Sequence, residues 1–240
     1  MESAAGNANL EGMTPDELKK RAAEAAVAQI KDGMVVGLGT GSTAKHAVDS
    51  IGRRVAEGLK VVGIPTSERT AEQARSLKIP LATFAEYAKL DLAIDGADEV
   101  EIGPLNLVKG LGGALLREKI VAGAAARFLV IVDDSKLVQH LGTHAPLPVE
   151  VNPFGWEVAA RKLRELGGDP KLRMQGGKPY LTDGSHYILD TSFGPIANPA
   201  QLAQQLDATV GVVEHGLFVG MTAQVLLASP DGVKVLEPGR

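Results

Sequence analysis

The sequence of 240 residues contains no cysteine. Disulfides, thiolate nucleophiles, iron–sulfur clusters and cysteine zinc sites are therefore excluded together. A chain without thiols fits a reducing compartment, and we expect it in the cytoplasm. No apolar run reaches the roughly 18 residues that a membrane span needs. Residues 1–12 include acids but no basic region, so they do not resemble a signal peptide, and we expect no membrane partner.

An excess of positive charge is also missing. Lysine and arginine number 25 against 29 acidic residues, and the formal net charge is -4. Without a long basic run we expect no nucleic-acid surface, although a local basic pocket for one phosphate is compatible with this charge. The hydrophobic fraction of 45% is typical of a globular protein, and 240 residues are enough to bury a substantial core.

The histidines of the sequence also lack a convincing metal-ligand spacing. His140 and His144 have the spacing of ligands on a helix, but Gly142 and Pro146 interrupt that segment and no third ligand is evident. We therefore predict no metal site. The Gly-x-Ser-x-Gly motif of serine hydrolases is absent too.

What the chain does contain is an alternation of helices and short apolar strands. A helix begins at Thr14 with a capping box to Glu17 and runs to Lys31. Apolar strands are predicted at residues 34–38, 59–64, 90–94 and 128–132, and helices at residues 44–56, 67–77 and 114–126. Strands that are apolar on both faces indicate a parallel sheet covered by helices. We therefore predict an α/β fold with a Rossmann-like parallel-sheet domain.

The pattern changes at residues 141–148. A strand from Val149, a helix at 154–166, short strands around Leu172 and Leu189, a helix at 199–206 and a last strand indicate a split βαβ arrangement. We predict a large catalytic domain of residues 1–141 and 215–240, with residues 1–13 as a disordered tail. Residues 142–214 form a smaller inserted α+β (ferredoxin-like) domain. Residues 217–219 and 223–228 are expected to rejoin the first sheet, and residues 233–236 close the chain.

Ligands of parallel sheets bind beyond the carboxyl ends of the strands. The loops that follow Leu38, Ile64, Ile94 and Val132 should therefore open onto one crevice. This rule brings three groups to a single predicted site. They are Thr40 to Thr43, Asp95 to Asp98, and Lys136.

The loop Gly39-Thr40-Gly41-Ser42-Thr43 lies between a strand and a helix. Backbone N–H groups at a helix N-terminus favour an anion, and the hydroxyls of this loop add donors. The dinucleotide fingerprint fails, because Ser42 stands where its third glycine is needed, and the lysine of a Walker loop is missing. The simpler alternative is a tight turn with a serine or threonine cap. We favour a monophosphate site.

A second group of polar residues can move protons. Asp95 and Asp98 end a buried strand, where an unpaired carboxylate is costly, although they can also be solvated turn acids. Lys109 precedes a glycine-rich bend whose N–H groups can stabilise a developing oxyanion. Glu118 follows on a helix, where in a closed pocket it can move a proton between adjacent carbons. The alternative for Glu118 is a surface acid paired with a lysine.

Five segments in order resemble ribose-5-phosphate isomerase of the A type. The resemblance spans nearly the whole chain, from Glu17 to Lys234. Its segments are Gly-Thr-Gly-Ser-Thr-Ala at 39–44, Asp-Gly-Ala-Asp-Glu at 95–99, the run 109–119, Ser-Lys at 135–136 and Pro-Leu-Pro-Val-Glu-Val at 146–151. Each segment alone is weakly specific, but five in this order and spacing are strongly specific.

The resemblance implies reversible conversion of D-ribose 5-phosphate to D-ribulose 5-phosphate, in the non-oxidative branch of the pentose phosphate pathway. It implies that Glu118 takes a proton from C2 of the opened aldose and returns it at C1 through an enediol. Asp95 would help to open the furanose ring, and Lys109 would steady the enediolate. No metal or cofactor takes part, and a homodimer is expected.

The resemblance also implies which residues contact the sugar phosphate. They are Lys19, Thr40, Gly41, Ser42, Thr43, Asp95, Gly96, Ala97, Asp98, Lys109, Gly110, Leu111, Gly112 and Lys136. Two positions depart from the pattern of the family. Leu111 replaces a glycine of the bend, and Asp134 stands before Ser-Lys where glycine is frequent. These departures concern substrate affinity more than reaction type.

Two other functions stay open at this point. Coenzyme A transferases share the fold and the phosphate loop, but their attacking glutamate needs a long groove for the coenzyme. A sugar-phosphate sensor without catalysis is the second alternative, and such regulators usually carry a DNA-binding module. The combination of lysine and aspartates favours a compact sugar phosphate.

Overall fold

The structure is a computed structural model and describes residues 13–239. Most of the tail that the sequence predicts at residues 1–13 lies outside the described residues. Met13 is the exception, because it packs against the hydrophobic core beside the first helix. None of the helices within the described range combines the length and apolar character needed to cross a membrane.

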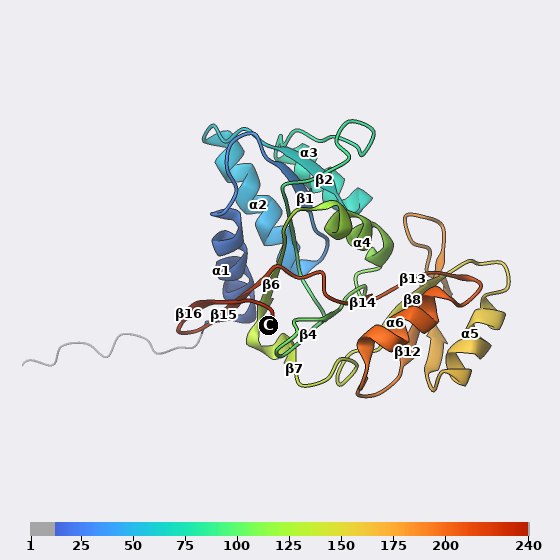
Figure 1. Cartoon of the computed structure of the whole chain (residues 1–240). Helices are drawn as coiled ribbons and strands as arrows, with labels where there is room; N and C mark the ends of the chain where they lie inside the picture. Colours follow the sequence, from blue (N-terminus) through green and yellow to red (C-terminus); the bar gives the residue numbers. More distant parts are fainter. Residues whose placement is uncertain (1–12, 240) are drawn as a thin grey trace, which may run out of the picture.

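A six-stranded sheet forms the centre of the larger part of the molecule (Figure 1). Its strand order is β16-β15-β6-β3-β1-β2, and the five strands from β15 to β2 are parallel while β16 is antiparallel. The α/β fold is therefore confirmed as a mixed, mainly parallel sheet. The bounds are β1 Val35–Leu38, β2 Val62–Pro65, β3 Leu92–Asp95, β6 Phe128–Asp133, β15 Gln224–Ser229 and β16 Gly232–Leu236.

Helices cover both faces of this sheet. On one face, α1 (Pro15–Val27), α2 (Ser42–Ala56) and α3 (Glu68–Ser76) contribute to a core with strand residues such as Val36 and Ile131. On the other face, α4 (Leu115–Ala124) packs over residues such as Val130. Strands β1, β3 and β6 are buried along their whole length, which explains their continuous apolar sequences.

The predicted start of α1 is confirmed in detail. The Thr14 hydroxyl accepts a hydrogen bond from the Glu17 N–H at 3.3 Å, and the Glu17 carboxylate accepts one from the Thr14 N–H at 2.7 Å. The helix ends at Val27, four residues before the predicted Lys31, because the chain turns there toward β1. α2 begins at Ser42, two residues earlier than predicted, so the predicted phosphate loop of residues 39–43 runs directly into its first turn.

The prediction for residues 217–219 is wrong. Instead of rejoining the main sheet, β14 (Leu217–Phe218) pairs with β5 (Leu107–Val108) in a second sheet of order β14-β5-β4-β7. Its other strands are β4 (Glu99–Glu101) and β7 (Leu137–Val138). Phe218 packs beneath the main sheet, with its ring centroid 6.3 Å from that of Phe128. The prediction for residues 223–228 is confirmed, since β15 joins the main sheet beside β6.

Residues 147–215 form a four-stranded antiparallel sheet with two helices and their own core, seen on the right in Figure 1. Its strand order is β13-β8-β12-β9. The sequence missed the small hairpin of β10 and β11, whose two-residue strands show no apolar pattern. The elements are β8 Leu147–Val151, α5 Trp156–Glu165, β9 Asp169–Leu172, β10 Met174–Gln175, β11 Lys178–Pro179, β12 Tyr187–Ser192, α6 Pro199–Asp207 and β13 Val212–His215.

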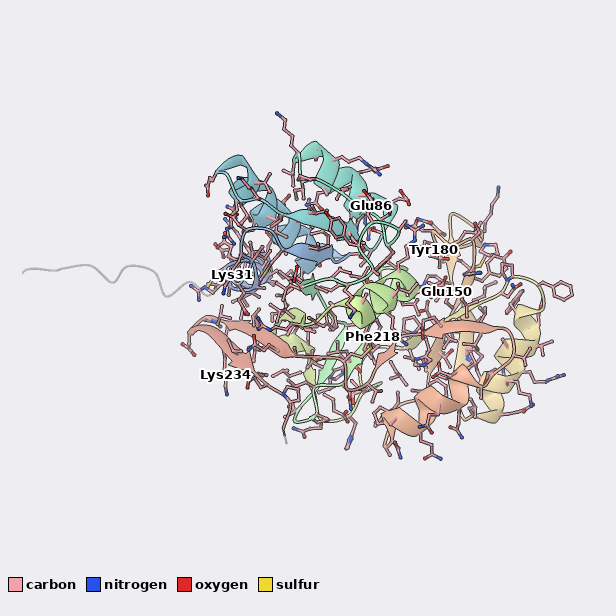
Figure 2. The ribbon with its side chains drawn as sticks, turned by 45° about the horizontal axis from the view of Figure 1, so that its top comes forward. Lys31, Glu86, Glu150, Tyr180, Phe218 and Lys234 are labelled. Carbon is pink, nitrogen blue, oxygen red and sulfur yellow. The ribbon has the colours of Figure 1, made fainter. Side chains whose placement is uncertain are left out.

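Figure 2 shows the side chains that fill the space between these layers, with Phe218 and Glu150 close to where the two parts meet. A buried carboxylate ties the connection between them to the larger part. Glu99 accepts hydrogen bonds from the backbone N–H groups of Gly142, His144 and Ala145 at 2.5, 2.6 and 2.9 Å. Its side chain therefore replaces the water that the connecting loop would otherwise need.

We expect Glu99→Gln to destabilise the fold. The amide NH₂ group faces backbone donors that it cannot satisfy, and each buried donor left without an acceptor costs about 1–3 kcal/mol. Urea denaturation should show a lower free energy of unfolding than for Glu57→Gln, which alters an exposed position after α2 and serves as the control. Equal stability of the two variants would contradict this role.

Candidate active site

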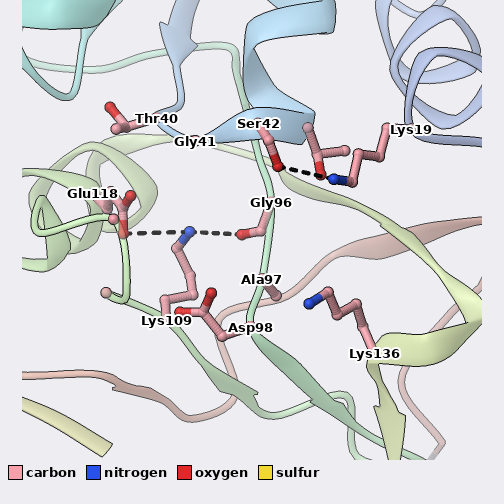
Figure 3. A pocket seen from close by; sticks show the side chains of 13 residues that line it. Lys19, Thr40, Gly41, Ser42, Gly96, Ala97, Asp98, Lys109, Glu118 and Lys136 are labelled. Carbon is pink, nitrogen blue, oxygen red and sulfur yellow. Dashed lines mark hydrogen bonds and ion pairs between the residues drawn. The ribbon is translucent and has the colours of Figure 1, made fainter. Parts of the chain in front are cut away.

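The carboxyl ends of the parallel strands open onto a cavity of about 110 Å³ (Figure 3). Its walls are formed by several elements, which are the loops after β1 and β3, the short 3₁₀ helix after β6, the glycine bend and α4. The lining residues are Lys19, Thr40, Gly41, Ser42, Thr43, Gly96, Ala97, Asp98, Lys109, Gly110, Gly112, Glu118 and Lys136. Asp95 and Leu111 are the two predicted positions outside this lining. The strand-end rule thus brings distant segments to one place.

The predicted phosphate loop depends on close backbone packing. A Cβ atom at Gly39 would lie 2.3 Å from Asp95 Oδ1, so only glycine fits beside this carboxylate. Gly41 adopts a φ of 117°, which also favours glycine. No side chain caps the N-terminus of α2 within the described structure, so its first N–H groups are available to a ligand. The Ser42 hydroxyl accepts a hydrogen bond from Lys19 Nζ at 3.1 Å.

The hydroxyl of Thr40 turns into the protein. It lies 2.7 Å from Thr66 Oγ1, 2.8 Å from Ser67 Oγ and 3.0 Å from Thr70 Oγ1, and all of these side chains are buried. The sequence predicts this hydroxyl as a phosphate donor, whereas the structure uses it to fix the loop. The prediction that the loop after Ile64 opens onto the crevice is wrong, because this loop contributes no residue to the cavity lining. It supplies Thr66 and Ser67 to the hydroxyl cluster, and α3 supplies Thr70. These partners come from a neighbouring loop and helix, so no local pattern around Thr40 predicts them.

A buried lysine connects the acidic residues. Lys109 Nζ donates to the Gly96 carbonyl oxygen at 2.6 Å and lies 3.4 Å from Glu118 Oε2 (Figure 3). It also lies 3.0 Å from Asp95 Oδ2. All three ionisable side chains are at most 4% exposed. Asp95 lies beneath Lys109, where its Oδ1 accepts from the N–H groups of Gly96 and Thr40. Direct access to the cavity therefore belongs to Lys109 and Glu118.

Glu118 has an unusual environment. Its Oε2 atom is buried and has no hydrogen-bond partner within the described residues, so its contact with Lys109 is ionic only. Burial raises the pKa of Glu118 to about 8, against the opposing effect of Lys109 and with the support of Asp95 and Asp98. The prediction of a raised pKa in a closed pocket agrees with this geometry, and a surface acid is excluded. The arrangement suits a group that gains and loses a proton near neutral pH.

The partners of Lys109 keep it charged. Burial alone would lower the pKa of Lys109, but the carboxylates of Asp95, Glu118 and Asp98 outweigh burial and raise that pKa above its ordinary value. Burial also raises the pKa of Asp95, although Lys109 and two backbone N–H groups oppose the rise. The site therefore presents a fixed positive charge beside a carboxyl group of adjustable protonation.

A metal-ligand geometry occurs elsewhere in the described structure. Asp207, Glu214 and His215 bring potential ligand atoms within 4.8 Å of one another. Lys119 Nζ lies 2.5 Å from Glu214 Oε1, and His215 Nδ1 accepts a hydrogen bond from the Leu217 N–H. A cation would have to displace the ammonium group, so this cluster is better suited to tying α4 to the smaller part.

Residues 62–232 match the sequence model of a family described as ribose 5-phosphate isomerase A (phosphoriboisomerase A). The chain belongs to this family. Among curated relatives, ribose-5-phosphate isomerase A of Synechococcus sp. (strain JA-3-3Ab) is 60% identical over 92% of this chain and 97% of its own length. The protein of the same name in Gloeobacter violaceus is also 60% identical, over 94% of this chain and 98% of its own.

Solved structures agree with the family assignment. Ribose 5-phosphate isomerase A of Methanocaldococcus jannaschii matches 93% of this chain and 100% of its own, with a TM-score of 0.89 and 43% identity. A D-ribose-5-phosphate isomerase in complex with phospho-erythronic acid matches with a TM-score of 0.91 and 38% identity over 94% of this chain and 100% of its own. The chain is thus an aldose–ketose isomerase of the pentose phosphate pathway, as the resemblance predicts.

The raised pKa of Glu118 has a consequence for stability. Its ordinary pKa of 4.5 applies to the unfolded chain, and about 8 applies to the folded one. Between these values the folded state binds more protons, so this group's contribution to stability falls as the pH rises through that window. We expect the free energy of unfolding of Glu118→Gln, relative to that of wild type, to rise by at least about 1 kcal/mol from pH 5 to pH 8.5.

Urea denaturation at both pH values measures this gain. Glu72→Gln, which changes an exposed carboxylate on α3, is the control and should follow wild type at both pH values. If the difference between wild type and Glu118→Gln does not depend on pH, the buried carboxyl group does not titrate in this window.

Proposed function

We propose that the cavity binds the open chain of D-ribose 5-phosphate and that Glu118 moves the proton in its conversion to D-ribulose 5-phosphate. One observation carries this proposal. A buried carboxylate oxygen, which has no hydrogen-bond partner among residues 13–239, lies beside the Lys109 ammonium in a cavity that also contains the uncapped N-terminus of α2. An anion site and a base in one small cavity suit a short phosphorylated sugar.

The phosphate end of the substrate is assigned to the loop of Gly41, Ser42 and Thr43. The N–H groups and the dipole of α2 attract the anion, while the positive charges of Lys19 and Lys136 line the same cavity. Lys19 Nζ is already fixed by its hydrogen bond to the Ser42 hydroxyl. Thr40 contributes its backbone and holds the loop in shape.

The reacting carbons are assigned to the other end of the cavity. Glu118 removes the proton from C2 and returns it at C1, and the oxygens of the enediolate are stabilised by Lys109 and by N–H groups of Gly110 and Gly112. With a pKa of about 8, roughly one Glu118 in ten is ionised at pH 7. This carboxylate is a stronger base than a solvent-exposed one, which matches proton abstraction beside a carbonyl.

Ring opening is the first step, and the resemblance assigned it to Asp95. Because Asp95 lies beneath Lys109 rather than in the cavity lining, we propose that it acts through the lysine. Asp95 holds Nζ at 3.0 Å and keeps it charged, so Lys109 can donate a hydrogen bond to the ring oxygen. Asp98, Gly96 and Ala97 line the wall against which the sugar lies.

The two departures from the family pattern are compatible with this role. Leu111 does not need glycine, since it lies outside the positive-φ residues, and its side chain is 44% exposed. Its N–H donates to Asp98 Oδ2 at 2.9 Å, so it supports the site through its backbone. Asp134 is exposed, and solvent screens its charge from Lys136.

We also propose the finer organisation that the sequence predicts. Residues 1–141 and 215–240 would form a Rossmann-like catalytic domain, and residues 142–214 an inserted ferredoxin-like domain. The strand order β13-β8-β12-β9 and the shared core of α5 and α6 support the second assignment. A homodimer in the cytoplasm is proposed from the family resemblance. The match to isomerases over nearly the whole chain disfavours the transferase and sensor alternatives.

Glu118→Gln should lower kcat roughly 10²- to 10⁴-fold, because general base catalysis contributes that much. NMR of the product formed in deuterium oxide should show solvent deuterium at C1 for wild type. The wild-type kcat/KM should rise with pH toward about 8, as the carboxyl group ionises. Glu72→Gln is the control, and equal turnover by it and by Glu118→Gln would remove Glu118 from the reaction.

Lys19→Met should act on the phosphate end alone. A hydrogen bond from a charged group contributes about 1.5–3 kcal/mol, so we expect KM to rise by roughly tenfold or more while kcat changes little. Lys20→Met, at the next and exposed position of α1, is the matched control. A loss confined to kcat would place Lys19 with the proton-transfer groups and contradict the assignment.

A further inference from the structure

The glycine-rich bend of residues 110–113 is also contacted from its outer side, by residues of the smaller part. Arg173, which follows β9, lies with its guanidinium group against Asp190 of β12. Its Nε donates to Asp190 Oδ2 at 2.9 Å and its Nη2 to Oδ1 at 2.5 Å. The Arg173 side chain is only 14% exposed. Such a two-point contact fixes both the plane and the direction of the guanidinium.

The third nitrogen of this group points at the bend. Arg173 Nη1 donates to the carbonyl oxygens of Gly110 and Leu111, both at 3.1 Å. Tyr180 covers the guanidinium at 5.7 Å, and its hydroxyl lies 2.2 Å from where a Cβ atom of Gly113 would be. Side chains from the smaller part therefore fill the outer side of the bend.

These contacts determine where the N–H groups of the bend point. The described chain has no cis peptide bond, so each carbonyl and the following N–H point in opposite directions. The peptide after Gly110 is held at both ends, since its oxygen meets Arg173 and the Leu111 N–H donates to Asp98. The Leu111 oxygen also faces Arg173, so the Gly112 N–H points away from it, and Gly112 lines the cavity.

We propose that Arg173, oriented by Asp190, is a positioning residue for the isomerisation. It directs the Gly112 N–H at the substrate oxygen that becomes negative in the enediolate. A cation hydrogen-bonded to the Leu111 carbonyl also polarises that peptide, which makes the Gly112 N–H a stronger donor. This role rests on the proposed function of the cavity, and Arg173 itself touches no substrate.

The test compares Arg173→Ala with Lys171→Ala. Lys171 lies two residues earlier, is exposed and pairs only with exposed Asp169 at 3.6 Å, so it is the matched control. We expect Arg173→Ala to lower kcat roughly 10- to 100-fold, the range for a misplaced oxyanion donor. KM and the Kd of inorganic phosphate should stay near wild type, because the phosphate loop is untouched. Guanidinium chloride at millimolar concentration should restore part of the turnover.

Binding of phospho-erythronic acid provides a readout that needs no turnover. Its carboxylate resembles the enediolate, so its Kd should rise in Arg173→Ala while that of inorganic phosphate does not. The milder Asp190→Asn should show the same pattern to a smaller extent. Equal kcat in Arg173→Ala and Lys171→Ala, or a parallel loss of inorganic phosphate binding without guanidinium rescue, would overturn the proposal. An inactive wild type would reject the proposed function, and the Kd comparison would still test Arg173.

Discussion

The buried ammonium group of Lys109 is the charge on which the active site depends. A buried cation is costly unless carboxylates and carbonyls surround it, and here Asp95, Glu118 and the Gly96 carbonyl do so. The antiparallel pairing of β5 with β14 in the second sheet places it, because the Lys109 N–H donates to the Gly216 oxygen at 2.9 Å just beyond these strands. A Cβ atom at Gly216 would lie 2.2 Å from the Lys109 carbonyl oxygen, so this strand pairing requires glycine. The small sheet thus determines where the charge lies.

The same lysine gives the two acids beside it different roles. Asp95 accepts hydrogen bonds from two backbone N–H groups in addition to its contact with Lys109. Within the part of the chain that the structure describes, Glu118 Oε2 has only the longer ionic contact with Lys109. The carboxyl group with more hydrogen-bond donors therefore holds the lysine, while the one with fewer donors is left to exchange a proton. Two carboxyl groups with one shared partner acquire separate functions from their surroundings.

The sequence predicted that distant segments meet at one site, because the carboxyl ends of parallel strands lie at one edge of the sheet. This rule does not depend on which side chains follow each strand. The sequence did not predict that Lys109 covers Asp95. The position of a residue at the end of a strand indicates the edge of the sheet, but not how deeply its side chain is buried below the cavity. The error at residues 217–219 has a similar cause, because a two-residue strand shows no periodicity that separates one sheet from another. The partners of Thr40 and the contacts of Arg173 come from distant elements, which local patterns do not contain.

The two ends of the cavity are built from chemically different groups. Hydroxyls of Thr40, Thr66, Ser67 and Thr70 hold the phosphate loop, and hydroxyl groups do not titrate near neutral pH. Buried carboxyl groups gather at the other end, where Lys109 joins Asp95 and Glu118. A change of pH therefore alters the protonation of Glu118 while the loop to which we assign the phosphate keeps its shape. Substrate anchoring and proton transfer can thus respond separately to the same conditions.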